Sequence, residues 1–145
     1  AVRFSKAPVT MLTYAQASSM SGILLQCADK RILMPDCEFM LHHGSIYIEN
    51  DSVRARSAIE NNDRGCKRML QIFARRAKIG PYFLEKEWTD AKIEKFFDDK
   101  LSQKGDWYLS AEEAVYYGLA DGILGERGFE TIAKIRKGPK YREAV

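Results

Sequence analysis

Residues 9–43 alternate between strand and helix patterns, and this alternation restricts the possible folds more than any other feature of the sequence. Residues 9–14 are β-branched and apolar, which predicts a buried strand. From Ala17 the apolar residues lie three or four apart, which predicts a helix. Residues 31–34 and 38–43 then predict two short strands. A strand, a helix and two strands in about forty residues predict an α/β fold.

A second helical pattern, in residues 51–78, is unusually long. Asn50 or Asp51 can cap its start, and a glycine-proline pair closes its end. A helix of about 27 residues is about 40 Å long, more than a domain of this size needs to cover one sheet. We therefore expect part of the region at residues 45–80 to project and to contact a partner.

The remaining residues predict shorter elements. In chain order these are a helix at residues 89–97 capped by Thr89, a polar loop at 98–105, a short strand at 107–109, a helix at 110–117, a strand at 121–124 and a basic tail at 138–145. The helix at 110–117 begins with a capping box, in which Ser110 and Glu113 can satisfy each other's backbone donors.

The composition is typical of one soluble globular domain. The chain has 145 residues, 46% hydrophobic and 30% charged, which is enough to bury one ordinary core, so we expect a single domain over residues 1–145. The net charge of +3 is too balanced to imply a nucleic-acid or membrane partner. No segment approaches the roughly 20 apolar residues of a membrane span.

The cysteines argue against a disulfide framework and against a zinc site. Cys27, Cys37 and Cys66 are odd in number and lack the paired spacing of metal ligands. Free cysteines fit a reducing compartment, where they act as small apolar residues. We expect a cytoplasmic protein that holds neither a metal nor a cofactor.

The only two histidines are adjacent, at the end of a predicted strand. Because side chains alternate across a strand, His42 and His43 should point to opposite faces, and at most one of them can serve a given site. A histidine before a glycine loop is a candidate general base, since its pKa lies near neutrality. The alternative is a hydrogen-bonded structural histidine.

Three serines lie between the first strand and the first helix, at positions 18, 19 and 21. A hydroxyl at a helix N-terminus lies near free backbone N–H groups, which can stabilise an oxyanion when the hydroxyl attacks a carbonyl. Serine is also a common helix cap, and the G-x-S-x-G pattern of a hydrolase elbow is absent. This pattern alone leaves the three serines interchangeable.

A serine nucleophile needs a base, and the base needs an orienting carboxylate. Asp106, just before the strand at residues 107–109, is one candidate. Asp98 and Asp99 compete with it, and spacing does not choose among the three. Asp106 can equally be a turn residue after Gly105.

Three segments together resemble one family. Residues 8–20 contain Ala-Ser-Ser-Met, residues 30–43 end in Phe-Met-Leu-His-His, and residues 106–121 contain Leu-Ser-Ala-Glu-Glu-Ala and Tyr-Gly-Leu-Ala-Asp. In order and spacing they closely resemble the ClpP family, the proteolytic subunits of the Clp protease, from about Pro8 to Leu124. The resemblance implies a ClpP/crotonase-like fold of repeated β-β-α units with a long handle helix.

The resemblance also implies roles for individual residues. Ser19, before the methionine, matches the nucleophile, His42 matches the base and Asp106 matches the acid. The family pattern further implies an oxyanion donor at the backbone N–H of Met20 and a substrate-binding strand that begins at Gly44 and Ser45.

The family's assembly defines the expected function. The long helix matches the handle through which two heptameric rings meet and enclose a chamber. The implied partners are further copies of the chain, other ClpP-type subunits, a Clp ATPase and peptide substrates, with no nucleic acid and no membrane. We expect a serine endopeptidase that cleaves unfolded proteins inside that chamber.

The sequence departs from the family pattern in several places. Family members carry an additional preceding region, with a glycine-rich loop that supplies a second oxyanion donor, an axial loop and much of the ATPase-docking surface. We expect that this sequence is a fragment, that another chain supplies the region, or that the protein is a reduced form. Gly105 replaces a frequent arginine, Gly44 replaces a usual proline, and the loop at residues 97–104 looks longer.

Two other functions compete with the protease. One is a structural ring subunit that is weakly active or inactive. The other is a binder of nucleic acid or an acidic partner, which would use basic residues along the long helix, namely Arg54, Arg56, Arg64, Lys67, Arg68, Arg75, Arg76 and Lys78.

Overall fold

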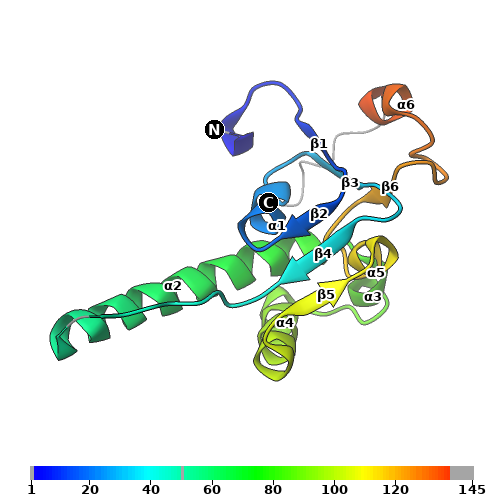
Figure 1. Cartoon of the computed structure of the whole chain (residues 1–145). Coiled ribbons are helices and arrows are strands. Elements are labelled where there is room, and N and C mark those ends of the chain that lie inside the picture. The colour runs from blue at the N-terminus through cyan, green and yellow to red at the C-terminus, as the bar shows by residue number, and fades with distance from the viewer. Residues whose placement is uncertain (1, 50, 138–145) are drawn as a thin grey trace.

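Two β-β-α units open the chain (Figure 1). The structure is a computed structural model that describes residues 2–49 and 51–137. The first unit contains β1 (Thr10–Thr13), β2 (Gln16–Ser18) and α1 (Met20–Leu25). The second contains β3 (Lys30–Leu33), β4 (Glu38–Leu41) and α2 (Ser52–Ala77). Asn50 and the expected basic tail at residues 138–145 lie outside the described residues.

The two strands of each unit enter different sheets. One sheet has the order β1-β3-β6 and the other the order β2-β4-β5, where β5 is Trp107–Leu109 and β6 is Gly122–Ile123. Strand β1 pairs with β3 and β2 with β4, both in parallel, while β5 runs antiparallel to β4. The α/β prediction and its repeated β-β-α units are therefore confirmed.

Helices complete the described chain. These are η1 (Val2–Phe4), α3 (Pro81–Leu84), α4 (Asp90–Lys104), α5 (Ala111–Tyr116) and α6 (Ile132–Lys137). The capping box before α5 forms as expected, since the Ser110 side chain accepts from the Glu113 N–H and the Glu113 side chain accepts from the Ser110 N–H. The short helices η1, α3 and α6 have too few apolar positions for the sequence pattern to predict them.

Two boundary predictions are wrong. The helix expected from Ala17 begins at Met20, because Gln16–Ser18 pairs with β4 as strand β2. The polar loop expected at residues 98–105 is the second half of α4, which continues to Lys104. Leu101 is almost completely buried and lies one helical turn after the buried Phe97, so packing extends the helix through a polar sequence.

The core lies between the two sheets, the C-terminal half of α2 and helices α3 to α5. Aromatic rings dominate it, with Phe73 of α2 packing edge-on against Phe39 of β4 at a centroid distance of 6.4 Å. Phe83 and Phe97 extend the cluster, with their ring centroids 5.7 Å apart. Such contacts favour specific ring geometries beyond simple area burial, so they fix how α4 lies on the β2-β4-β5 sheet.

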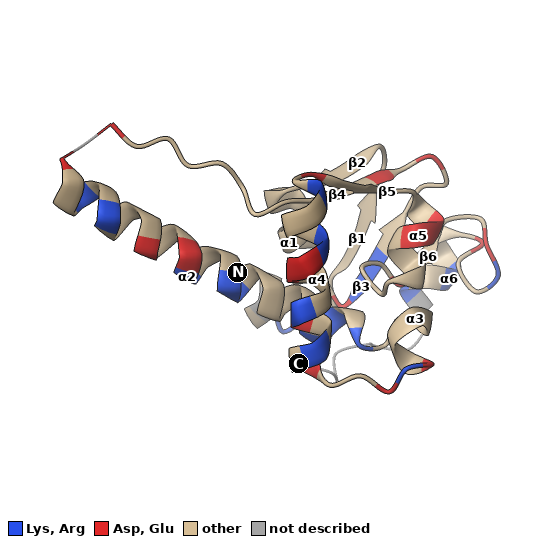
Figure 2. Cartoon of the chain, turned by 90° about the horizontal axis from the view of Figure 1, so that it is seen from below, with Lys and Arg blue, Asp and Glu red and all other residues tan. Residues whose placement is uncertain are grey.

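The N-terminal half of α2 projects from the rest of the molecule (Figures 1 and 2). Every fully buried residue of this helix lies at or after Leu70. Asp51 caps the projecting end, and its carboxylate accepts from the N–H groups of Val53 and Arg54 at 3.1 and 3.0 Å. The expectation that part of the long helix leaves the body of the molecule is thus met.

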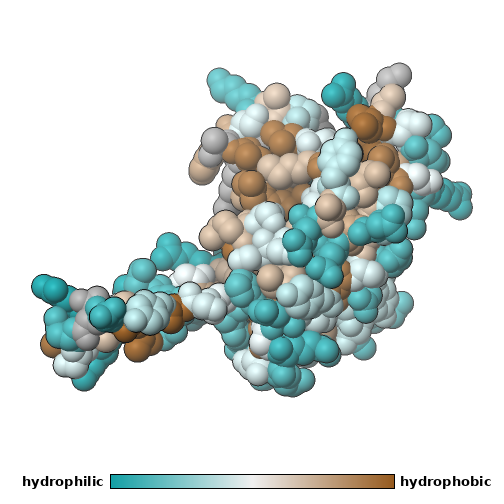
Figure 3. Space-filling model, in the orientation of Figure 1, coloured by the Kyte–Doolittle hydropathy of each residue, from teal (hydrophilic) through white to brown (hydrophobic). Residues whose placement is uncertain are grey.

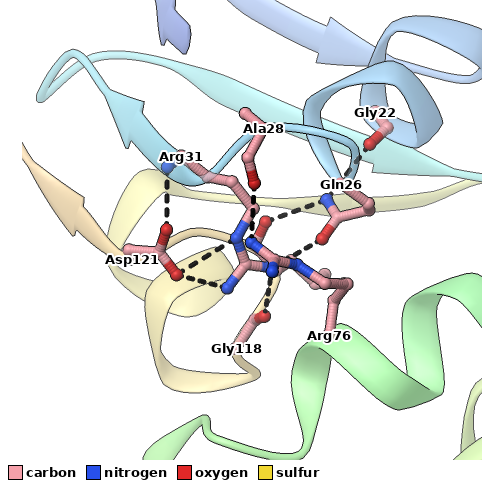
Figure 4. Close-up of polar contacts among 8 residues, drawn as sticks. Gly22, Gln26, Ala28, Arg31, Arg76, Gly118 and Asp121 are labelled. Atoms are coloured by element: carbon pink, nitrogen blue, oxygen red, sulfur yellow. Dashed lines mark hydrogen bonds and ion pairs between the residues drawn. The ribbon is translucent and has the colours of Figure 1, made fainter. Parts of the chain in front are cut away.

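A buried ionic network joins β3 to the start of β6 (Figure 4). The Arg31 guanidinium pairs with Asp121, and it also donates to the Gly118 carbonyl at 2.9 Å and to the Gln26 side chain at 2.5 Å. Arg76 of α2 donates to the Ala28 carbonyl at 2.9 Å, and burial followed by repulsion from Arg31 lowers the pKa of Arg76 to about 10. The sequence suggested that Arg76 belongs to an exposed basic face of the long helix. Arg76 is instead buried.

Apolar side chains gather on the face of the molecule around β1 and α1 (Figure 3). Tyr14 and Leu24 are exposed and border a hollow of ≈ 360 Å³ beside β1. Over residues 2–49 and 51–137, no helix has both the length and the apolar character required to cross a bilayer.

Candidate active site

Strand register in the β2-β4-β5 sheet brings the three predicted side chains to one edge. Ser18 of β2 pairs with Met40 of β4, so the next residue along the first strand lies beside the end of the second. Leu41 pairs with Trp107 in the antiparallel β4–β5 ladder. Continuing that register by one residue sets His42 opposite Asp106. The site therefore follows from the pairing of strands that are distant in sequence.

Ser19 occupies the turn from β2 into α1 in a strained conformation. Its φ of 53° and ψ of −120° are unfavourable for a residue with a Cβ. The Ser19 N–H donates to the Met40 carbonyl at 3.0 Å, while its side chain makes no capping bond to α1. The hydroxyl is thus free to face the sheet edge, where Ser19 Oγ lies 2.6 Å from His42 Nε2.

Gly22 lets the helix after Ser19 approach the sheet closely. A Cβ at this position would lie 3.0 Å from the Phe39 ring and 3.2 Å from the Ala17 carbonyl oxygen. Contacts this short are rare for real side chains, so a larger residue would push α1 away from β4. The glycine therefore helps to set the position from which Ser19 faces His42.

The other ring nitrogen of His42 faces Asp106. His42 Nδ1 and Asp106 Oδ1 are 3.5 Å apart, too far for a strong hydrogen bond but close enough for an electrostatic contact. The His42 side chain is 23% exposed and that of Asp106 is 54% exposed. Asp106 follows Gly105, whose φ of 71° turns the chain from α4 into β5.

The competing residues have other partners. His43 Nε2 lies 2.9 Å from Asp98 Oδ1, and Asp99 pairs with Lys95 on the same helix. The two histidines therefore have separate partners, as strand alternation predicts, although β4 ends at Leu41, just before them. Asp98 and Asp99 do not reach His42 as its acid. The sequence did not reveal the His43–Asp98 pair, because the contact depends on where α4 packs, which local patterns do not predict.

The two other serines are explained locally. Ser18 Oγ is buried, and within the described part of the chain it has no hydrogen-bond partner. Ser21 Oγ donates to the Ser18 carbonyl at 2.7 Å and so closes the turn before α1. Of the three hydroxyls, the one at Ser19 is in contact with a histidine.

Possible metal ligands and cysteine thiols are the other groups of the chain that could carry chemistry. In residues 2–49 and 51–137 no group of three or more His, Cys, Asp or Glu side chains is arranged to hold a metal ion. All three cysteines are free. Burial raises the pKa of the Cys37 and Cys66 thiols, which disfavours a reactive thiolate at either position.

The sequence matches one known protein family. A model of the Clp protease family matches residues 1–127. The chain belongs to the Clp protease family. The mixed α/β architecture agrees with that of the family, and the resemblance inferred from the Ser, His and Asp segments is confirmed.

Individual members of the family are distant relatives. An ATP-dependent Clp protease proteolytic subunit from Deinococcus radiodurans is 28% identical over 131 residues, which cover 86% of this chain and 55% of the relative. Its counterpart from Leuconostoc citreum is 27% identical over 92% of this chain and 61% of the relative. A proteolytic subunit 3 from Synechococcus sp. is 27% identical over 85% and 56%. The chain thus spans little more than half the length of these curated relatives.

Two further predicted features of this Clp protease family member directly follow Ser19 and His43 in the chain. Met20 is the first residue of α1, so its N–H has no acceptor within the helix. Residues 44–49 after His43 form no regular element, and Gly44, with a φ of 87°, and Ser45 are exposed. Their expected roles, as oxyanion donor and as peptide-binding strand, stay predictions.

Proposed function

We propose that the protein is a serine endopeptidase that cleaves unfolded polypeptides. The observation that carries the proposal is the 2.6 Å contact between Ser19 Oγ and His42 Nε2 in a member of the Clp protease family. A hydroxyl is a weak nucleophile unless a base accepts its proton, and a neutral imidazole at this distance can do so.

The proposed reaction proceeds through an acyl-enzyme. Ser19 Oγ attacks the peptide carbonyl while its proton passes to His42 Nε2, and the carbonyl oxygen becomes an oxyanion. The imidazolium then donates that proton to the leaving amine as the C–N bond breaks. Water, deprotonated by His42, attacks the ester, and release of the acid returns the proton to Ser19. One peptide bond and one water are consumed in each cycle.

Neighbouring groups supply orientation and charge stabilisation. Asp106 holds the Nδ1–H tautomer of His42 and stabilises the imidazolium, for which the 3.5 Å separation must shorten when substrate binds. The Met20 N–H, at the start of α1, donates to the oxyanion. The segment that begins at Gly44 and Ser45 pairs with the substrate backbone as an added strand.

The proposed working form is an oligomer. The exposed first half of α2 offers a surface that one chain leaves uncovered, and it suits the contact between two heptameric rings around a chamber. Other ClpP-type subunits and a Clp ATPase are the proposed partners, since the curated relatives are named as subunits of an ATP-dependent protease.

The site geometry also favours a second candidate, a ring subunit of low activity. Asp106 is more than half exposed and lies 3.5 Å from His42, so water competes for both groups. A triad held this loosely would leave the chain dependent on partner subunits for alignment. Activity of the purified chain alone would exclude this alternative.

Peptide hydrolysis by the purified chain tests the proposal. A fluorogenic peptide and an unfolded protein should both be cleaved, and Ser19→Ala and His42→Ala should each lower turnover by at least about 10³-fold. The matched control is Ser18→Ala, which removes the adjacent hydroxyl that has no contact with His42. Turnover that survives Ser19→Ala would show that Ser19 is not the nucleophile.

A further inference from the structure

His43 connects the end of β4 to two helices. Its ring Nε2 lies 2.9 Å from Asp98 Oδ1 of α4. Its backbone carbonyl accepts from Cys66 Sγ of α2 at 3.1 Å. A carboxylate only accepts hydrogen bonds, so Nε2 of His43 carries the proton in this contact. Side chain and backbone of one residue are thus held from two directions.

These contacts occur where regular structure stops. The β4 ladder ends at Leu41, which is buried, and His42 is the first residue beyond it. From Gly44 the chain forms no element up to residue 49, and residues 44–47 are exposed. The backbone of His42 is therefore fixed by the sheet on one side and by His43 on the other. Without the His43 contacts, Leu41 would be the last residue whose backbone is held, one residue before the base His42.

The surroundings of Cys66 keep its thiol in the donor form that the contact with the His43 carbonyl needs. Burial, followed by repulsion from Asp63, raises the pKa of the Cys66 thiol, so at neutral pH it stays protonated and can donate. His43, Cys66 and Asp98 line a hollow of ≈ 480 Å³ between α2 and α4, together with Asn62, Asp63, Lys67, Leu70 and Glu94. Its three carboxylates and single lysine make the hollow a net acidic environment for a histidine N–H.

We propose that His43 and Asp98 are positioning residues, which hold the His42 imidazole against Ser19 by anchoring the backbone that follows it. The inference rests on the proposed function only for its effect on turnover. The two side chains touch no reacting atom. They act by keeping the 2.6 Å contact between Ser19 Oγ and His42 Nε2 populated.

Kinetics of matched variants provide the first measurement. Asp98→Ala removes the partner of His43, whereas Asp99→Ala removes a charge one residue further along α4 that pairs with Lys95 instead. We expect Asp98→Ala to lower kcat for peptide hydrolysis by about 10- to 100-fold with KM within about twofold, as displacement of a catalytic group does. Asp99→Ala should leave both constants unchanged. His43→Gln, whose amide can still donate to Asp98, should retain more activity than His43→Ala.

Nitrogen-15 spectra of the histidine rings provide the second measurement and need no activity. The sequence contains only two histidines, so the His42 ring signals can be assigned by comparison with His43→Gln. We expect Asp98→Ala to shift or broaden the His42 ring signals as well as those of His43, and Asp99→Ala to change neither. Thermal unfolding identifies any variant that does not fold, and His43→Ala then replaces Asp98→Ala.

The outcomes separate the positioning role of His43 and Asp98 from the proposed peptidase activity. If the His42 signals in Asp98→Ala coincide with those of the unsubstituted protein, or if kcat is unchanged, the positioning role is wrong. If the unsubstituted protein cleaves no peptide but its His42 signals respond to Asp98→Ala, the proposed peptidase activity fails and the positioning role stands.

Discussion

At the residue scale, the strained backbone of Ser19 explains why its hydroxyl contacts His42. The φ of 53° turns the Ser19 side chain out of the capping position and toward the sheet edge. An ordinary helix start would direct the same hydroxyl to the N–H groups of α1. Strain of this kind costs about 1–3 kcal/mol and persists only where the surrounding structure enforces it. Here the Met40 carbonyl and the close packing at Gly22 do so.

Ser18 should be dispensable. Its buried hydroxyl has no partner within residues 2–49 and 51–137, and burying an unpaired hydroxyl costs about 1–3 kcal/mol. Ser18→Ala should therefore leave turnover unchanged and keep or raise the free energy of unfolding, measured by urea denaturation. A loss of turnover comparable with that of Ser19→Ala would contradict the assignment of the nucleophile.

Asp121 should be essential for stability. It pairs with Arg31, which is fully buried, so removing the carboxylate leaves a charge without its partner. Asp121→Ala should lower the free energy of unfolding by about 3–5 kcal/mol in urea titration. Asp36→Ala, at an exposed turn, is the matched control and should change it by less than about 0.5 kcal/mol. Equal effects of the two substitutions would contradict the proposed importance of the buried pair.

At the element scale, strand register determines which residues meet at the site. Ser19 follows β2, His42 follows β4 and Asp106 precedes β5, so two ladders bring together residues that are up to 87 positions apart in the sequence. A shift of register by one residue would move every side chain to the opposite face. The contact of His42 with Asp106 is therefore a property of the sheet.

Helix α2 should be least stable at its projecting end. Its buried residues begin at Leu70, so the Asp51 cap is a main local stabiliser of the first turns. Asp51→Ala should cost about 1 kcal/mol there and speed amide exchange at residues 53–56 about fivefold, as measured by hydrogen exchange in unassembled protein. Residues 70–77 serve as the internal reference. Equal acceleration in both segments would contradict local fraying.

Local patterns predicted most elements but not their pairing. Composition predicted the strand at residues 9–14, although no residue of β1 is buried as that composition had indicated. Periodicity and capping patterns predicted the long helix and the capping box at Ser110. Periodicity failed in the second half of α4, where only Leu101 signals burial among polar residues. The resemblance to a family selected Ser19, His42 and Asp106. Neither approach revealed the His43–Asp98 contact, because it depends on how α4 packs beside β4.

At the scale of the whole molecule, the projecting part of α2 is the main sign of assembly. A helix with an uncovered N-terminal half is stabilised when a partner packs against it. The chain spans 55% to 61% of the length of two relatives, which are named as subunits of an ATP-dependent protease.

Light scattering should reveal that assembly. We expect a mass corresponding to seven or fourteen subunits of 16.6 kDa, since the proposed rings are heptameric and meet in pairs. Substitutions to aspartate at Val53 and Ile59, two exposed apolar residues of the projecting half, should reduce fourteen subunits to seven. A monomer at all concentrations would contradict the proposed chamber.

The most direct test of the proposed serine chemistry is covalent capture of the nucleophile. The assembled protein is incubated with a fluorophosphonate, and the adducts are mapped by peptide mass spectrometry. We predict a single adduct at Ser19, which is lost in Ser19→Ala, is strongly slowed in His42→Ala and persists in Ser18→Ala. The absence of an adduct at Ser19 in assembled protein, or equal labelling after Ser19→Ala, would contradict Ser19 as the nucleophile.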